Sequence, residues 1–331
     1  MHPIIDLHCD LLSFLAEDSA RTVDDPLSKA SYTQMKEGYV SLQTLAIFTK
    51  SDKGSFAKGK KQVEAFINLL EKEPSRYEQW DVTKELKPTS PIALVTAFEN
   101  AYGFSEEGEP IQIGLSYLDN LLKILKNILY ISLTWDGENR FGGGNGSSLG
   151  LKEDGKRVLE WLDRKQIAVD LSHSSDFLAD GIFNYIDKKN LSIPVMASHS
   201  NARFITNKER NLPDEIAREI FKRGGIVGLN LFSPFLGKQA SNIAAHVEHF
   251  MHLGGEKNIC FGADFFPELD FEYLKNKYQV SSCFFPELND ASCYPRALCI
   301  LEKSLSLKES QLKGIAYENF SNYIKKTFEQ K

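Results

Sequence analysis

Histidine and carboxylate side chains stand directly after short apolar runs in this sequence. The first run, Ile4–Leu7, leads into His8-Cys9-Asp10, and because side chains alternate along an extended chain, His8 and Asp10 share one side. Four later runs are followed in the same way by Glu99, His173, His199 and Asp264. Nitrogen and oxygen ligands without thiolates are typical of a catalytic site for zinc or a similar divalent metal. The pattern therefore favours metal-assisted chemistry.

The number of candidate ligands bears on the number of ions. Five ligands exceed what one tetrahedral ion with a bound water needs, whereas two ions that share a bridging carboxylate account for them. Glu99 could lie between a pair formed by His8 and Asp10 and a pair formed by His173 and His199. The alternative is that each polar residue is only a hydrogen-bonded strand terminus. That explanation is adequate for any one of them but poor for the whole set.

The elements that must position these side chains are eight apolar or β-branched runs of strand length. Most intervals between them hold a segment with helical periodicity, which predicts a single closed (β/α)8 TIM-type barrel over residues 1–331. A doubly wound open sheet is the rival, but the first run lacks the glycine-rich turn that usually follows it. The predicted strands are Ile4–Leu7, Val40–Phe48, Ile92–Ala97, Ile128–Leu133, Ile167–Asp170, Pro194–Ser198, Ile226–Asn230 and Ile259–Gly262.

Charge and composition narrow the classes of partner. Lys and Arg number 39 against 45 Asp and Glu, so no positive excess is available for nucleic acid or an anionic membrane surface. No apolar run is long enough to span a bilayer, and no leader-like segment precedes the first strand. Five cysteines without metal-type spacing favour reduced thiols. We therefore expect a cytoplasmic protein with a small-molecule substrate, and a homodimer stays open.

Several motifs, in order along nearly the whole chain, resemble the membrane (renal-type) dipeptidases and their bacterial relatives, a branch of the metal-dependent amidohydrolase superfamily. The His-x-Asp element alone is a weak signal, but the ordered set is specific. The matching pieces are Asp6-Leu7-His8-Cys9-Asp10, the Glu99 segment, Leu133-Thr134-Trp135, Asp170-Leu171-Ser172-His173, Ser198-His199-Ser200, Arg210-Asn211-Leu212-Pro213, His246-Val247-Glu248-His249, Gly262-Ala263-Asp264-Phe265 and Glu318-Asn319-Phe320.

The resemblance implies a role for each matching residue. It implies two zinc ions, with His8 and Asp10 on one, His173 and His199 on the other, and Glu99 bridging them. It further implies that Asp264 serves the proton transfers and that Arg210 contacts the substrate's C-terminal carboxylate, a role that suits a guanidinium. The alternative for Arg210 is a surface ion pair beside Asp214.

Two positions depart from the family pattern. The mammalian enzymes have a substrate-contacting histidine where this chain has Trp135, and tryptophan cannot carry a proton or a positive charge. The segment after Asp264 is also rebuilt, and residues 265–295 form an aromatic-rich stretch that we expect to be a long binding loop or lid. Both changes bear on the identity of the substrate.

The expected reaction is hydrolysis of a dipeptide's amide bond by a hydroxide that bridges two zinc ions. One alternative is the same metal machinery acting on another small amide, lactam, lactone or ester, which Trp135 makes plausible. The other is a non-catalytic metal-binding barrel. His246, His249 and His252 are spaced by three on a predicted helix, and we assign them no ligand role. Asp170 is either an acceptor that orients a ligand histidine or a packed barrel residue.

Overall fold

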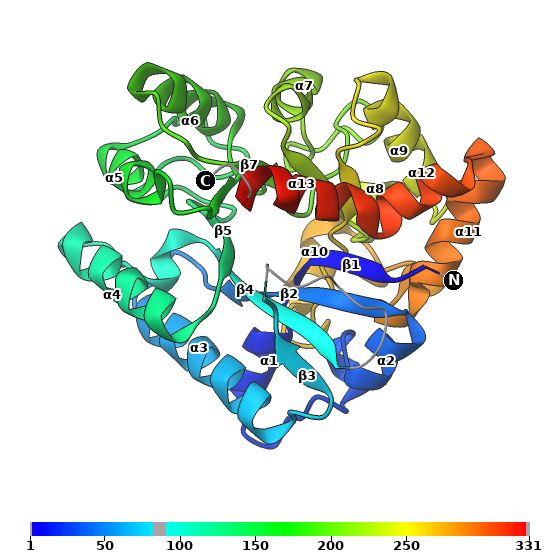
Figure 1. Cartoon of the computed structure of the whole chain (residues 1–331), viewed down its shortest axis with the longest axis horizontal. Helices are drawn as coiled ribbons and strands as arrows, with labels where there is room; N and C mark the ends of the chain where they lie inside the picture. The colour runs from blue at the N-terminus through cyan, green and yellow to red at the C-terminus, as the bar shows by residue number, and fades with distance from the viewer. Residues whose placement is uncertain (1, 82–90, 329–331) are drawn as a thin grey trace.

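A closed barrel of parallel strands forms the body of the protein (Figure 1). The computed structural model describes residues 2–81 and 91–328. Within them, hydrogen bonding follows the order β2-β1-β9-β8-β7-β6-β5-β4, and a further β2–β4 pairing closes the ring. The predicted (β/α)8 barrel is thereby confirmed. The strands are β1 Ile4–Cys9, β2 Val40–Phe48, β3 Tyr77–Gln79, β4 Ile92–Glu99, β5 Ile128–Ser132, β6 Ala168–Asp170, β7 Val195–Ala197, β8 Ile226–Leu229 and β9 Ile259–Phe261.

Strand β3 lies outside the barrel and was missed in the sequence prediction. It pairs with the first half of β4, from Ile92 to Leu94, while β5 pairs with the second half, at Thr96 and Phe98. The two strands thus share one edge of β4. With three residues, of which Glu78 is exposed, β3 carries no run of buried apolar residues that would mark it as a strand.

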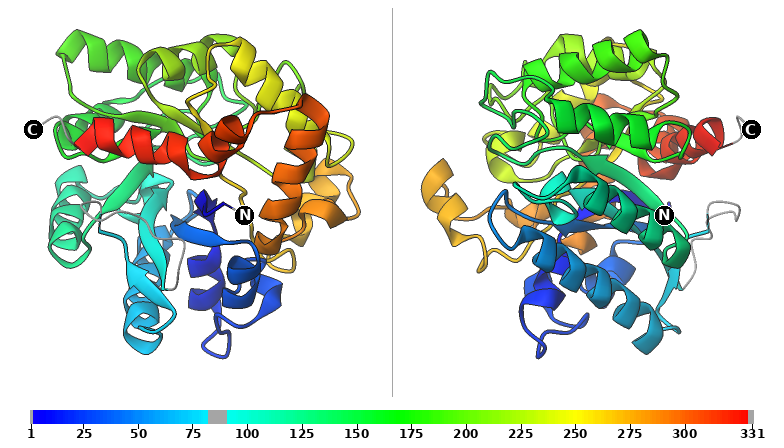
Figure 2. Two further views of the ribbon diagram at one scale, coloured as in Figure 1. Left: turned by 45° about the vertical axis from the view of Figure 1, so that its right-hand side comes forward. Right: turned by 90° about the vertical axis from the view of Figure 1, so that its left-hand side faces the viewer.

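Helices surround the barrel and also close one end of it. Figure 2 shows α10 standing out on the side away from both chain termini, so it belongs to the rim where the strands end. None of the described helices is both long and apolar enough to cross a membrane. They are α1 Leu11–Glu17, α2 Tyr32–Glu37, α3 Ser55–Lys72, α4 Ile111–Ile124, α5 Glu153–Leu162, α6 Asp176–Lys189, α7 Asp214–Lys222, α8 Ser233–Leu236, α9 Asn242–His252, α10 Glu272–Tyr278, α11 Tyr294–Leu305, α12 Glu309–Lys313 and α13 Asn319–Phe328.

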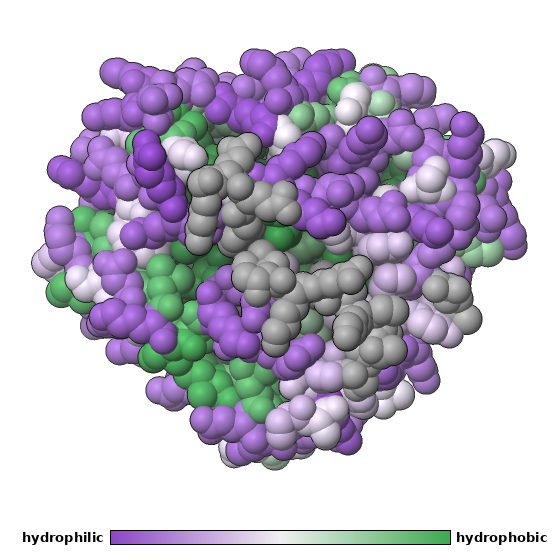
Figure 3. All heavy atoms as spheres, in the orientation of Figure 1, coloured by the Kyte–Doolittle hydropathy of each residue, from purple (hydrophilic) through white to green (hydrophobic). Residues whose placement is uncertain are grey.

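Two apolar clusters stabilise this arrangement. The larger packs the helices on the outside of the strands, and the smaller fills the barrel interior. At the end where the strands begin, α13 places Phe320, Tyr323 and Ile324 in the interior cluster, so the barrel is plugged there. The face of the molecule that Figure 3 shows is mostly hydrophilic, with an apolar strip at the lower left around α3 and α4. Only the opposite end of the barrel is therefore free for a site.

Backbone fills the barrel beside the β7 end. A Cβ atom added at Gly228 would lie 2.0 Å from the Ser198 carbonyl oxygen, and one at Gly262 would lie 1.9 Å from it. Both contacts are far shorter than a van der Waals approach. Glycine is therefore required at both positions, because strands β7, β8 and β9 approach one another too closely for any side chain.

The stretch over residues 265–295 is more regular than its sequence suggests. It contains α10 and two short 3-10 turns, at Pro286–Leu288 and Ala291–Cys293, and α11 begins at its end. Phe266, Phe271 and Leu274 of this segment are buried. The segment is thus packed onto the rim of the barrel instead of extending from it as an open loop.

Candidate metal centre

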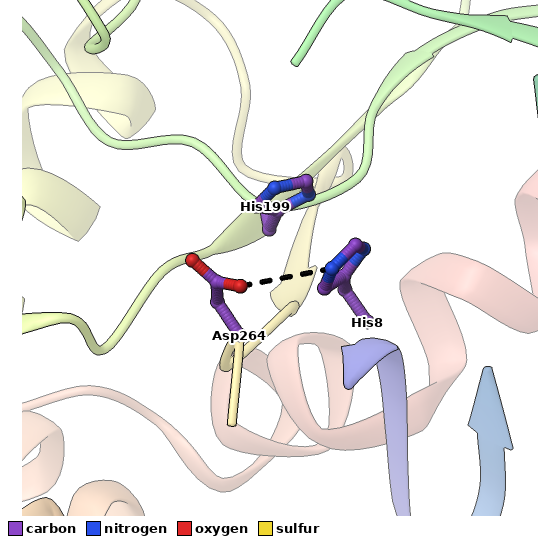
Figure 4. A group of neighbouring side chains, drawn as sticks. All are labelled: His8, His199 and Asp264. Atoms are coloured by element: carbon purple, nitrogen blue, oxygen red, sulfur yellow. Dashed lines mark ion pairs between the residues drawn. The ribbon is translucent and has the colours of Figure 1, made fainter. Parts of the chain in front are cut away.

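Six histidine and carboxylate side chains meet at the rim where the strands end. Figure 4 shows His8, His199 and Asp264 pointing toward one another from the end of β1 and from the segments after β7 and β9. Three overlapping groups have ligand atoms close enough to hold a metal ion, and every member is buried. The groups are His8, Asp10 and Glu99; Glu99, His173 and His199; and His8, His199 and Asp264.

Glu99 is the residue that joins these groups. Its Oε2 lies 3.2 Å from Nε2 of His8, and its Oε1 lies 2.9 Å from Nε2 of His173 and 3.7 Å from Nε2 of His199. Each carboxylate oxygen therefore faces a different histidine set. On the far side of His8, Asp264 Oδ1 is 3.6 Å from Nε2.

All three histidines present the same nitrogen to the centre because hydrogen bonds fix the other one. Nδ1 of His8 is 2.7 Å from the Tyr130 hydroxyl, which donates its own proton to the Leu7 carbonyl at 3.2 Å. Nδ1 of His199 is 2.7 Å from the Ser198 hydroxyl. These partners favour a proton on Nδ1, which leaves the Nε2 lone pair free for a ligand.

The Ser198 hydroxyl is itself oriented by Asp170. It donates to Asp170 Oδ2 at 2.8 Å, so its oxygen is left to accept a hydrogen bond from Nδ1 of His199. Asp170 also accepts from the backbone N–H groups of Ser172 and Ser198. The predicted choice for Asp170 is thereby resolved, since it orients a histidine, but through Ser198 and at His199.

Asp136 orients the third histidine and was not found by sequence reasoning. Its Oδ1 lies 3.3 Å from Nδ1 of His173, and its Oδ2 accepts from Lys277 of α10 at 2.8 Å. Although burial favours the neutral acid, the hydrogen bond to His173 and the charges of His173 and Lys277 lower the pKa of Asp136. The carboxylate is therefore charged. An acidic residue in a loop carries no sequence signal that would pair it with a histidine 37 positions away.

Negative charge dominates the centre. Burial raises the pKa values of Asp10 and Asp264, whereas the charges and hydrogen bonds of His8 and His173 outweigh burial at Glu99 and lower its pKa. At His8, burial opposes the charge, but the attraction of Glu99 prevails and raises the pKa to about 10. The carboxylates thus draw a cation, either a proton or a metal ion, to Nε2 of His8.

Two of the site residues have left-handed backbone conformations. His173 has φ 66° and Asp264 has φ 64°, each three residues beyond the end of its strand. Such a conformation is costly for a residue other than glycine and is characteristic of functional sites. At His173 this conformation is supported by the glycine-rich loop of residues 142–146, because the Asn145 N–H donates to the His173 carbonyl at 2.8 Å.

Arg210 and Trp135 lie on different sides of the centre. Arg210 is buried, donates to the Ser200 hydroxyl and the His199 carbonyl at 2.9 and 3.0 Å, and leaves its Nε without a partner among the described residues. It is not a surface ion pair, since Asp214 instead contacts His249 at 2.8 Å. Trp135 is half-buried, with its ring 6.1 Å from that of His173.

A pocket open to solvent lies beside the centre. Asp10, Glu99, His173 and Asp264 contribute its polar wall. Trp135 and Asp136 line it as well, and the remaining lining side chains are aromatic or aliphatic. The geometry thus provides convergent ligands beside a space for a small molecule, which is the usual form of a catalytic pocket.

The three helical histidines lie apart from this centre. His246 is buried, accepts from the Ala202 N–H at 3.1 Å and donates from Nε2 to the Leu236 carbonyl at 2.9 Å. His249 pairs with Asp214, and its ring stacks on Phe204. None of the three helical histidines, His252 included, belongs to a candidate metal group among the described residues.

Comparison with known proteins places this arrangement in a family. The family model described as "Membrane dipeptidase (Peptidase family M19)" matches residues 1–330. An uncharacterized dipeptidase of Schizosaccharomyces pombe is 24% identical over 324 residues, which cover 91% of this chain and 72% of that protein. Mouse dipeptidase 3 is 31% identical over 176 residues, which cover 51% of this chain and only 31% of the mouse protein.

Solved structures match over almost the full length. A Rhodobacter sphaeroides metallo peptidase, liganded with a phosphinate mimic of the dipeptide L-Ala-D-Ala, superposes with a TM-score of 0.80 at 20% identity. The match covers 99% of each chain. At this level of identity the superposition shows a shared fold.

The buried, neutral His246 predicts a loss of stability in mild acid. Burial lowers its pKa to about 4, whereas the unfolded chain takes up the proton near the ordinary value of 6.5. Stability should therefore fall as the pH drops through 6.5 and level off near 4. Between pH 7.5 and pH 5 this residue should account for about 2 kcal/mol of the loss in unfolding free energy.

Urea unfolding of the wild type and of His246→Gln at both pH values checks this. The variant is expected to lose about 2 kcal/mol less than the wild type over that interval. Equal losses would show that His246 is not held neutral by the fold.

Proposed function

The chain belongs to the membrane dipeptidase family, Peptidase family M19, and on that premise we propose that it hydrolyses dipeptides with two zinc ions held at the rim of the barrel. Membership makes it a metal-dependent hydrolase of the dipeptidase class. The single observation that supports the proposed site is the convergence of three histidine Nε2 atoms on the two oxygens of Glu99. The steps below concern what the side chains of this chain do.

The residues present fit a cationic cofactor. Nε2 of His8, Oδ1 of Asp10 and Oε2 of Glu99 are fully buried, and among the described residues none of them makes a hydrogen bond of acceptable geometry, although the His8 and Glu99 atoms lie 3.2 Å apart. Buried polar atoms are normally satisfied, and three that face one another point to a ligand they share. Three carboxylates in one buried centre also require compensating positive charge.

In the proposed site, His8 and Asp10 would hold one ion, His173 and His199 would hold the other, and Glu99 would contribute a ligand to both. Zinc suits this set because it accepts imidazole and carboxylate ligands and leaves a position open. When bound, the two ions supply a water of lowered pKa and polarise the carbonyl of the scissile amide. Tyr130, Ser198 and Asp136 act on the ligands, since each fixes the orientation of one imidazole.

Asp264 is the group we propose for the proton transfers. Its Oδ2 accepts from the Asn230 side chain at 2.8 Å, while Oδ1 faces the centre near His8. Burial raises its pKa, which improves it as a proton carrier near neutral pH. In this role it takes a proton from the attacking water and passes it to the departing amine.

Arg210 is proposed to hold the C-terminal carboxylate of the dipeptide. Two of its N–H groups are bound by protein, and its Nε is not. Its guanidinium lies 5.6 Å from the ring of Phe235, a residue of the cavity wall, which places a buried positive charge directly behind that wall. A free carboxylate in the substrate would offset that charge.

The position of Trp135 supports a second class of substrate. It lines the cavity and offers one N–H donor and an apolar ring, so another small amide, lactam, lactone or ester could be held there in place of a dipeptide. A cytoplasmic location is supported by the five cysteines, all of which are free. A homodimer stays a prediction.

The metal proposal predicts two zinc ions per chain. Protein purified without chelator and dialysed with zinc should contain two ions by elemental analysis, and Glu99→Ala should hold fewer because both ions lose a ligand. Glu248→Ala removes an exposed glutamate of α9 and should retain both. A wild type that binds no zinc contradicts the proposed centre.

The proposal for Asp264 separates chemistry from metal binding. Asp264→Asn keeps the shape and the contact with Asn230, so the zinc content should stay at the wild-type value. The loss of the proton carrier should lower kcat by roughly 10²–10⁴-fold on any good dipeptide. Asp180→Asn, the same change at an exposed position of α6, should leave kcat unaltered. Loss of zinc in Asp264→Asn would make Asp264 a ligand, and an unchanged kcat would remove it from the reaction.

The proposal for Arg210 distinguishes a dipeptide from a neutral amide. Arg210→Ala should lower kcat/KM for a free dipeptide by roughly ten- to a hundredfold, because a hydrogen bond to a charged group contributes about 1.5–3 kcal/mol. Arg210→Lys keeps the charge and should lose less. Hydrolysis of the matching C-terminally amidated dipeptide should already be slow in the wild type and should change little. Equal rates on free and amidated substrates would contradict the carboxylate contact and favour the second class.

A further inference from the structure

One side of the cavity is a continuous arc of aromatic rings. It begins at Phe235, whose ring centroid is 5.5 Å from that of Tyr278 and 4.8 Å from that of Phe232. Phe232 is in turn 5.6 Å from Phe266, and Phe266 is 5.1 Å from Phe271. All of these side chains line the cavity.

From Phe271 the arc continues through two more rings. Phe271 lies 5.7 Å from Phe48, and Phe48 lies 5.2 Å from Trp135. The seven rings, which we call the aromatic arc, therefore run unbroken from the Arg210 side to the His173 side of the centre. Leu274 of α10 adds an aliphatic side chain to the same lining.

The charged side chains that line the cavity belong to the metal centre or contact it, and Arg210 lies behind the Phe235 ring without lining the cavity. Asp10, Glu99, His173 and Asp264 belong to the metal centre, and Asp136 is occupied by His173 and Lys277. Among the described lining residues, none offers a charge to the arc side. Lys50 stands beyond the arc, 5.9 Å from the Trp135 ring and 4.7 Å from that of Tyr273, and does not line the cavity.

From this division we propose that the aromatic arc is the side-chain subsite of the enzyme and selects dipeptides that carry an apolar or aromatic residue. The inference rests on the proposed dipeptidase function. A peptide whose amide bond reaches the metal centre lies in a cavity whose other lining residues are the arc, Asp136 and Leu274. Burial of an apolar side chain there is favourable, whereas a charged side chain would lose its hydration without gaining a partner.

The α10 helix holds part of the arc in place. Tyr278 lies at its end, Phe271 directly precedes it, and Lys277 fastens it to Asp136. Because Asp136 also contacts His173, its carboxylate links α10 to a histidine of the centre. Asp136 therefore contacts both the helix that carries part of the subsite and a histidine beside which the scissile bond would lie.

The test is a series of dipeptides that differ in one side chain. With zinc-loaded wild type, kcat/KM for Ala-Phe and Ala-Leu, or for Phe-Ala and Leu-Ala, should exceed that for Ala-Ala by roughly tenfold or more. The charged members of the same series, Ala-Glu and Ala-Lys or Glu-Ala and Lys-Ala, should be poor substrates. Comparable values across both series would overturn the proposal while leaving the dipeptidase function intact. No hydrolysis of any member, Ala-Ala included, would instead contradict the proposed function.

Variants assign the selectivity to the arc. Phe271→Ala should reduce the preference for Phe over Ala side chains several-fold, whereas Phe177→Ala, which removes an exposed ring outside the cavity, should preserve it. The ratio of two substrates measured on one preparation does not depend on the fraction of folded enzyme. A preserved preference in Phe271→Ala would overturn the assignment.

A second variant tests the charge argument. Leu274→Lys places a cation beside the arc and, in the series that showed the preference, should raise kcat/KM for the Glu dipeptide relative to the Leu dipeptide by roughly tenfold or more, since the acidic side chain then has a partner. No change in this ratio would show that substrate side chains do not reach the arc.

Discussion

Three buried carboxylates in one centre are the constraint around which the rest of the site is arranged. Asp10, Glu99 and Asp264 come from three separate strand ends, and only a cation can make their proximity favourable in a buried environment. Each of the three histidines directs its Nε2 toward these carboxylates and has a hydrogen-bond partner at Nδ1. Beneath the centre, the plugged barrel and the glycine contacts leave no room for rearrangement. The fold therefore holds repelling groups together at a place where a metal ion can compensate them.

The barrel and the members of the centre could be predicted from the sequence because both depend on local patterns. Eight apolar runs gave eight barrel strands, and His8, Glu99 and Asp264 follow such runs directly. The C-terminal ends of the strands lie within two residues of their predicted positions. The difference places His8 and Glu99 within β1 and β4, while His173, His199 and Asp264 lie beyond their strands. These last three are nevertheless brought back to the centre, two of them by left-handed backbone turns that no side-chain pattern reveals.

What the sequence could not show are relations between distant loops. Asp136 stands next to Trp135 in an ordinary polar stretch, and only the folded chain brings it between His173 and Lys277. The aromatic arc likewise gathers its rings from the end of β2, from loops after β5 and β8 and from the segment around α10. The aromatic residues after Asp264 were visible, but their packing into a wall was not. Short-range periodicity thus identifies the framework and leaves the substrate surface to tertiary packing.

The close approach of β7, β8 and β9 has a consequence for how such a protein can diverge. Gly228 and Gly262 both abut the Ser198 carbonyl, so the backbone that seats His199 accepts no larger residue at either position. Helix α10 itself is instead held by side-chain contacts, such as those of Lys277 with Asp136 and of Tyr278 with Phe235, which can be exchanged one at a time. Mutation can therefore change the side chains of α10 that line the cavity without disturbing the backbone that seats His199. The backbone around His199 thus tolerates little change in sequence, whereas substitutions in α10 can change the substrate preference.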